Sequence, residues 1–178
     1  MKYFEKMRGN GQSPPQVSPA EVCWSWIGSF LGIAAVALIH YRLLDQLGLT
    51  MIIGSFGASA VLLYGAIRSP LAQPRNLLGG HILSAFIGVT AHLLLAEIPW
   101  LAAAVAVSSS IAVMHLTRTL HPPGGATALI AVTGGDSVYT LGYLYILMPV
   151  ALGAAVMLVV ALVVNNIPKT RKYPEFWW

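Results

Sequence analysis

Long apolar runs alternate with short polar breaks along most of the chain. Between residues 22 and 164 the charged residues are few and widely spaced; they are Arg42, Asp45, Arg68, Arg75, Glu97, Arg118 and Asp136. The runs between the breaks predict six apolar segments, at 22–44, 49–67, 76–96, 100–117, 122–133 and 139–164. A helix needs about 20 apolar residues to cross a hydrocarbon core of roughly 30 Å, and several runs reach that length. The pattern predicts an all-α, polytopic membrane helix bundle.

The composition supports this fold class and divides the chain into three regions. Hydrophobic residues make up 57% of the chain and charged residues 9%, whereas soluble domains carry about 25% charged residues. We expect a flexible cytoplasmic lead-in at 1–21, a membrane domain at 22–164 and an interfacial tail, basic and aromatic, at 165–178. Positive charge gathered at the two ends suits the headgroups of membrane lipid better than nucleic acid, which we do not expect as a partner.

The basic residues also predict the orientation of the segments. If the N-terminus is cytoplasmic, six crossings place Arg68, Arg75, Arg118 and the basic tail on the cytoplasmic side, as the positive-inside rule requires. Four crossings, with the second and fifth segments re-entrant, would place those three arginines outside. Charge therefore favours six crossings, although the fifth segment is so short that its full crossing stays open. We expect a multi-pass protein of the cell inner membrane with both termini cytoplasmic.

Two short stretches of sequence indicate an internal repeat. Residues 57–62, GASAVL, align without a gap with residues 125–130, GATALI, and residues 35–40 resemble residues 110–115. The halves 22–97 and 99–164 would each hold three segments, so they would insert with opposite topology. Inverted repeats with short, Gly/Pro-interrupted segments at matching positions indicate a transport site near the membrane midplane. The same small residues also let helices pack closely, and both explanations can hold together.

The stretch HPPGGAT, residues 121–127, predicts the start of a short helix inside the membrane domain. Proline fits the first turn of a helix, because its missing amide hydrogen would be unpaired there. The amides that follow carry the positive end of the helix dipole, which favours an anion. His121 either donates a hydrogen bond and carries a proton at this mouth, or bonds a backbone carbonyl at a simple loop-to-helix junction. The candidate binding residues of this half are His121, Pro122, Pro123, Gly124, Gly125 and Thr127.

The first half contributes a matching set of candidates. Ser55 would cap the second segment or contact a solute, and Ser59 aligns with Thr127. Arg75 either determines topology or draws anions to the cytoplasmic mouth, beside Asn76 and a histidine one turn into the third segment. The candidate binding residues of this half are Ser55, Gly57, Ser59, Arg75, Asn76 and His81.

Several classes of chemistry have no support in the sequence. The histidines and carboxylates show no metal-ligand spacing. There is no P-loop, no dinucleotide fingerprint and no serine or cysteine nucleophile signature. We therefore expect no metal, no cofactor, no ATP-driven transport and no enzymatic activity.

Four motifs together carry a resemblance to a known family. They are GSFGASAVLLYGA at 54–66, SPLAQPRNLLGGH at 69–81, HPPGGATALI at 121–130, and NN…YPEFW within 165–177. The chain resembles the HPP family of integral membrane proteins, which is usually described with four spans. Members from cyanobacteria and chloroplasts look like nitrite transporters, so the resemblance implies a transporter or channel for a small inorganic anion.

These observations combine into one leading hypothesis and two alternatives. We expect a small inorganic anion, nitrite-like, to pass between two inverted halves, passively or coupled to protons, with the N-termini of the second and fifth segments flanking the site. The alternatives are passage of a cation or neutral small solute, and a non-transporting membrane assembly protein. One protomer makes a small bundle, so we also expect a homo-oligomer.

Overall fold

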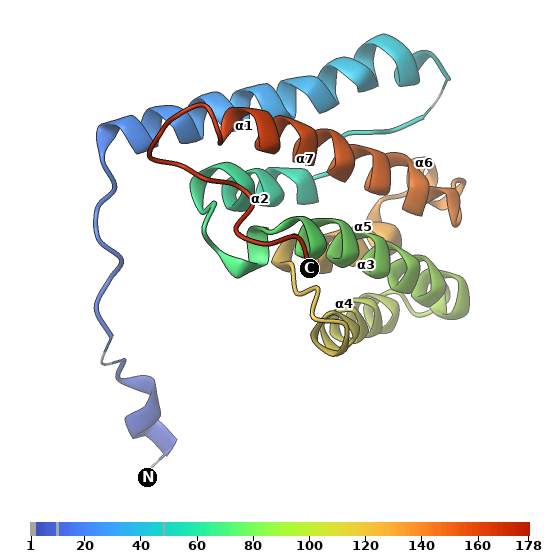
Figure 1. Cartoon of the computed structure of the whole chain (residues 1–178). Helices are drawn as coiled ribbons and strands as arrows, with labels where there is room; N and C mark the ends of the chain where they lie inside the picture. The colour runs from blue at the N-terminus through green and yellow to red at the C-terminus, as the bar shows by residue number, and fades with distance from the viewer. Residues whose placement is uncertain (1–2, 10, 48) are drawn as a thin grey trace.

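Helices account for all regular secondary structure in the part of the chain that the computed structural model describes, residues 3–9, 11–47 and 49–178 (Figure 1). Within these described residues, four helices are long and apolar enough to cross a membrane. They are α1 (Pro19–Ile39) continued by η2 (His40–Leu44), α3 (Pro74–Leu95), α4 (Pro99–Leu116), and η6 (Ile146–Ala151) continued by α7 (Leu152–Val164). This confirms an all-α, multi-pass membrane protein, while the arrangement as two inverted repeats stays a prediction.

The second and fifth segments are short, as the sequence predicts. Helix α2 (Ser55–Ala60) continues into η4 (Val61–Gly65), and residues 49–53 before it are not helical. Helix α5 (Pro122–Thr133) has 12 residues and is therefore roughly 18 Å long, against a hydrocarbon core of roughly 30 Å. The remaining short elements are η1 (Tyr3–Met7), η3 (Asp45–Leu47), η5 (Pro70–Ala72) and α6 (Asp136–Tyr139).

Proline starts α1, α3, α4 and α5, whereas the long helix η6–α7 begins at Ile146. Pro19, Pro74, Pro99 and Pro122 each occupy the first helical position of their helix. The fixed φ of proline suits that position, and the absent N–H leaves no unpaired donor there. At α1 the side chain of Ser18 adds a cap, since its Oγ accepts a hydrogen bond from the Glu21 amide at 3.3 Å.

The helices form two groups with α2 between them. Helices α1 and α7 lie side by side, while α3, α4 and α5 pack against one another, and α2 lies between the two groups (Figure 1). Tyr64 of η4 fills the space between α1 and α7, and its hydroxyl donates to the Met157 carbonyl at 3.0 Å. Two glycines of α1, Gly28 and Gly32, leave room for this ring, because a Cβ at either would overlap it.

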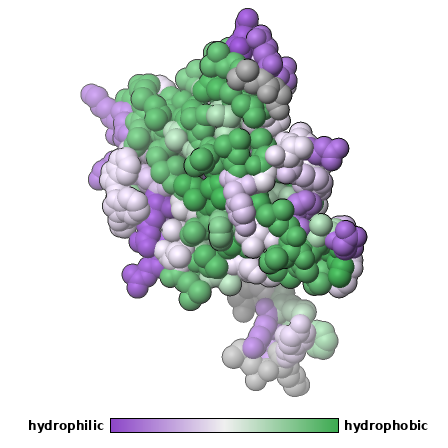
Figure 2. Space-filling view, turned by 90° about the vertical axis from the view of Figure 1, so that its right-hand side faces the viewer, coloured by the Kyte–Doolittle hydropathy of each residue, from purple (hydrophilic) through white to green (hydrophobic). Residues whose placement is uncertain are grey.

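The outer surface of the bundle is apolar. Large hydrophobic side chains such as Trp26, Leu94 and Leu116 are exposed. Figure 2 shows one side of the molecule, on which hydrophobic residues cover most of the surface and hydrophilic residues lie mainly towards its edges. An exposed apolar surface this extensive suits a lipid environment and not water.

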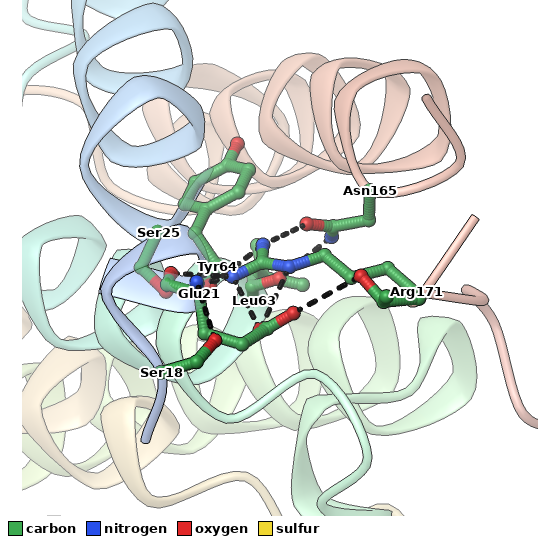
Figure 3. Close-up of polar contacts among 8 residues, drawn as sticks. Ser18, Glu21, Ser25, Leu63, Tyr64, Asn165 and Arg171 are labelled. Carbon is green, nitrogen blue, oxygen red and sulfur yellow. Dashed lines mark hydrogen bonds and ion pairs between the residues drawn. The ribbon is translucent and has the colours of Figure 1, made fainter. Parts of the chain in front are cut away.

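The C-terminal tail folds back onto the bundle through a buried arginine (Figure 3). Arg171 Nε donates to Glu21 Oε2 at 2.9 Å, and its Nη1 donates to the Tyr64 carbonyl and to Asn165 Oδ1 at 3.2 and 3.1 Å. Its Nη2 donates to the Glu21 carbonyl and to Ser25 Oγ, both at 2.9 Å. The tail is thus part of the fold, which the expectation of an interfacial anchor did not include.

A second set of bonds joins the tail to the loop before α3. The Tyr173 hydroxyl donates to the Ala72 carbonyl at 2.8 Å, and the Glu175 amide donates to Gln73 Oε1 at 2.9 Å. Burial, and to a smaller extent the neighbouring Tyr64 phenol, raises the pKa of Tyr173, so its hydroxyl remains a donor. The start of α1, the loop before α3 and the tail therefore meet at one end of the bundle.

Candidate functional site

Two buried histidines meet on one serine hydroxyl at the centre of the bundle. Ser59 Oγ lies 2.7 Å from His81 Nε2 and 2.9 Å from His121 Nε2. The centroids of the two imidazole rings are 5.0 Å apart. The three residues come from α2, from α3 and from the residue that precedes α5. Folding therefore brings together candidates that lie far apart in the sequence.

Hydrogen bonds extend this contact in both directions. His121 Nδ1 lies 2.7 Å from the Leu71 carbonyl oxygen, and His81 Nδ1 lies 2.7 Å from Thr127 Oγ1. Thr127 Oγ1 in turn lies 2.9 Å from Ser55 Oγ and 3.2 Å from the Pro123 carbonyl. We call five side chains the imidazole–hydroxyl network; they are those of Ser55, Ser59, His81, Thr127 and His121.

The side chains of the network are fully buried, and all their polar atoms have hydrogen-bond partners. All five residues are 0% exposed. No buried side-chain nitrogen or oxygen in the described residues lacks a hydrogen-bond partner. None of the five is a carboxylate, a lysine or an arginine, so the network is uncharged when both imidazoles are neutral. Such pairing is required, because an unpaired polar group in an apolar interior is costly.

The start of α5 determines the position of His121. The residue is extended, with φ −141° and ψ 103°, and the helix begins directly after it. Gly124 packs on α3, where a Cβ would lie 2.8 Å from the Gly80 carbonyl oxygen. A Cβ at Gly80 would lie 2.5 Å from His121 Cβ. Glycine at these two positions therefore lets α3 and the start of α5 approach closely, and this places His121 against α3.

One expectation about this helix start is wrong. The first two residues of α5 are prolines and have no N–H, and the Gly124 amide donates to the His121 carbonyl at 2.8 Å. The unpaired amides predicted to face an anion are therefore absent from these three positions. The hydrogen-bond donors at this place are the side chains of the network.

Helices α2 and α5 pass each other in opposite directions at the network. Ser55, the first residue of α2, contacts Thr127 in the middle of α5, whereas Ser59, one turn later, contacts His121 before α5 begins. The N-terminus of α2 and the N-terminus of α5 therefore lie at opposite ends of the network.

Other predicted site residues lie outside the network. Arg75 Nη2 donates to the Thr117 carbonyl at 2.6 Å, and Asn76 Nδ2 donates to the Leu120 carbonyl at 2.9 Å. These two side chains hold the connection between α4 and α5, and so they position His121 indirectly.

Three of the predicted binding residues near the starts of α2 and α5 also lie outside the network. Gly57 is exposed, and a Cβ there would meet no atom within 4 Å. Pro122 is exposed as well, while Gly125 is buried and faces Val107 of α4, whose Cγ1 would lie 3.8 Å from an added Cβ.

The structure adds neighbours to the predicted residues, of which sequence reasoning missed Tyr145 and Ser84. The Tyr145 hydroxyl donates to the Thr127 carbonyl at 3.1 Å, and the Phe56 ring meets His81 edge-on with centroids 5.5 Å apart. Ser84 lies one turn beyond His81 on α3, and its hydroxyl donates to Met114 Sδ at 3.7 Å. The helical spacing from His81 was a usable signal for Ser84, whereas no local pattern marks Tyr145.

Comparisons with known proteins agree on a membrane protein family. The family profile described as "HPP, transmembrane region" matches residues 14–174. Two proteins of Dictyostelium discoideum, each named as a transmembrane protein, are 48% identical over 181 residues and 46% identical over 183 residues. Both matches cover 100% of this chain, and this chain spans 58% and 64% of those relatives. No solved structure matches the chain.

Proposed function

We propose that this chain, which belongs to the HPP transmembrane family, carries a small inorganic anion of the nitrite type across a membrane, and that the imidazole–hydroxyl network is the binding place. The choice of nitrite as the anion rests on the resemblance of family members to nitrite transporters. The observation that carries the proposal is the burial of five polar side chains, all 0% exposed, that are linked to one another inside a mainly apolar bundle.

Polar groups inside a membrane domain are energetically costly. Where they occur, they often mark the pathway of a solute or a proton. A serine that bonds two imidazoles goes beyond what helix packing needs. Small residues and single hydroxyl back-bonds serve that purpose elsewhere in this chain, as at Ser110, whose hydroxyl donates to the Ala106 carbonyl at 2.7 Å. The network therefore has a role that helix association does not account for.

The donor set suits a small anion. Three hydroxyls and two imidazoles converge within hydrogen-bond distance of one another. Each hydroxyl can turn its hydrogen towards a negatively charged oxygen, and hydrogen bonds to charged groups are about twice as strong as neutral ones. The network is closed in this structure, so entry of an anion requires α2 to separate from α3 and α5.

Uptake of nitrite by proteoliposomes that contain the purified protein tests the proposal. Thr127→Val keeps the shape of the side chain but removes its hydroxyl, and we expect it to reduce uptake by about 10-fold or more, since a hydrogen bond to a charged group contributes about 1.5–3 kcal/mol. Thr127→Ser keeps the hydroxyl and should retain uptake. His115→Gln, on an exposed position of α4, is the control outside the network.

The alternative functions give different outcomes in the same assay. Uptake of a cation or a neutral solute, with none of nitrite, would replace the anion in the proposal. No uptake of any solute above empty vesicles by the wild-type chain would favour an assembly protein and contradict transport.

A further inference from the structure

The tautomers of both histidines follow from one end of the imidazole–hydroxyl network. The Leu71 carbonyl can only accept, so His121 must donate to it from Nδ1. A neutral His121 then has a bare Nε2, which accepts the single hydrogen of the Ser59 hydroxyl. Since that hydrogen is used, Ser59 can contact His81 only as an acceptor, and His81 must carry its hydrogen on Nε2.

The other end of the network offers a choice that depends on the protonation of His81. A neutral His81 with its hydrogen on Nε2 has a bare Nδ1, which accepts the single hydrogen of the Thr127 hydroxyl; Thr127 then no longer donates to Ser55 or to the Pro123 carbonyl. If Nδ1 gains a proton, it donates to Thr127 instead, and the Thr127 hydroxyl turns towards the Ser55 hydroxyl or the Pro123 carbonyl. A second arrangement with the same added proton places it on His121. Ser59 then accepts from His121 Nε2 and donates to His81 Nε2, so the hydrogen of the neutral His81 sits on Nδ1 and is donated to Thr127.

From this arrangement we infer that the imidazole–hydroxyl network takes up a single proton together with a single small monovalent anion, so that the species carried is electrically neutral. A proton arrives from the aqueous side and bonds to an imidazole nitrogen of the pair. If it arrives as the undissociated acid, the conjugate base stays as the bound anion; if it arrives as a hydronium ion, water is left behind and the anion enters separately. No electrons are transferred, and no covalent bonds other than N–H and O–H bonds are made or broken.

The network has no binding position for a second proton that is comparable to the position of the first. With both imidazoles cationic, Ser59 would accept from two N–H groups and its own hydrogen would lose its partner in the network. Two positive rings with centroids 5.0 Å apart would also repel each other in a low-dielectric interior. The number of protons is therefore limited to one by the shared serine.

No charged group among the contacts of the network replaces the anion. In the described residues, the phenol of Tyr145 bonds the backbone of Thr127, and Phe56 is the aromatic neighbour of His81. Arg75, on the same helix as His81, bonds the Thr117 carbonyl, and Tyr173 bonds the Ala72 carbonyl beside Leu71. No carboxylate is among the hydrogen-bond partners of either imidazole there.

Binding of the proton must therefore favour binding of the anion, and the reverse. A lone cation in this interior is costly, and an anion beside it removes much of that cost. By linkage, the anion raises the affinity for the proton by the same factor by which the proton raises the affinity for the anion. The coupling rests on the proposed function, whereas the arrangement of the protons does not.

Solid-state NMR of the ¹⁵N-histidine-labelled chain in lipid bilayers tests the arrangement of the protons. In alkaline buffer without nitrite we expect the hydrogen on Nδ1 of His121 and on Nε2 of His81. The signals are assigned by their loss in His81→Gln and in His121→Gln, with His115→Gln as the control. In acidic buffer with nitrite, one imidazole of the pair becomes doubly protonated on average. The opposite tautomers, or two fully cationic imidazoles, would overturn the inference.

Transport in proteoliposomes tests the coupling. With the membrane potential clamped at zero, an inward proton gradient should accelerate nitrite uptake over empty vesicles, and a potential without a proton gradient should not. Ser59→Ala cuts the link between the imidazoles and should reduce the response to the proton gradient by about 10-fold. Nitrite uptake driven by potential alone would refute the coupling and leave the proposed function standing. Absence of uptake under every gradient would refute both, while the NMR experiment still decides the arrangement of the protons.

Discussion

At the scale of single residues, Arg171 shows how a charge is held inside this bundle. Its side chain is 2% exposed, while its ionic partner Glu21 is 33% exposed. The guanidinium donates to two carbonyls, one hydroxyl, one amide oxygen and one carboxylate. Such a buried charge is tolerated because every donor direction is used.

Replacing Arg171 with methionine should therefore destabilise the protein strongly. The substitution keeps an apolar stem but leaves the buried carbonyl of Tyr64 and the Asn165 amide oxygen without this donor. We expect a loss of about 3–5 kcal/mol in the free energy of unfolding, seen as a lower melting temperature in detergent. Lys172→Met, at an exposed neighbour, should change stability by less than about 0.5 kcal/mol. Equal melting temperatures for the two variants would contradict the structural role of Arg171.

The polar residues of the network were predictable individually, but Arg171 was not. Ser59 and Thr127 were found because they occupy the same place in two similar stretches of sequence, and His121 because it precedes two prolines. Arg171 bonds Glu21, 150 positions away. Its basic and aromatic surroundings in the sequence are also typical of a surface tail.

At the scale of elements, close packing of α3 on α5 gives the network its geometry. Gly88 of α3 faces the backbone of α5, where a Cβ would lie 2.6 Å from the Ala128 carbonyl oxygen and 2.8 Å from its Cα. Backbone cannot move aside as a flexible side chain can. The two helices therefore depend on glycine at this contact, as small-residue packing in membranes requires.

Gly88→Ala should separate α3 from α5 and reduce stability by about 1–3 kcal/mol, the usual cost of overpacking. Gly57→Ala is the matched control, since a Cβ there meets nothing within 4 Å, and alanine should favour the helix by about 0.5–1 kcal/mol. Thermal unfolding in detergent measures both. A more stable Gly88→Ala variant would show that the helices can yield at this contact.

At the scale of the whole molecule, hydrogen bonds gather the basic loops at one end. The Tyr64 carbonyl at the end of η4 accepts from Arg171 of the tail. Leu71 bonds His121, and Arg75 bonds the Thr117 carbonyl after α4. The loop before α3, the connection between α4 and α5 and the tail thus adjoin one another, as expected for loops on the same side of a membrane.

The contacts lead to a prediction of topology. In a Cys23→Ser background, which removes the single cysteine of the chain, we introduce Arg68→Cys, Lys169→Cys and Asp136→Cys at exposed positions. Six crossings require an impermeant maleimide to label positions 68 and 169 from one side and position 136 from the other. If α2 and α5 are re-entrant and the chain crosses four times, positions 68 and 169 are labelled from opposite sides.

The sequence by itself determined the class of protein and the start of α5. Apolar segments as long as the bilayer core is thick indicate membrane-spanning helices, and the prolines after His121 predict the first residue of α5. Helices α3 and α4 begin at Pro74 and Pro99, two residues and one residue before the predicted segments. Only the tertiary structure decided which residues share hydrogen bonds. The similar stretches at 57–62 and 125–130 place Gly57 on the surface and Gly125 in the interior. Likewise, Ser59 meets both imidazoles because α2, α3 and the start of α5 converge. Local sequence carries no record of such convergence, since the partners are 22 and 62 positions away.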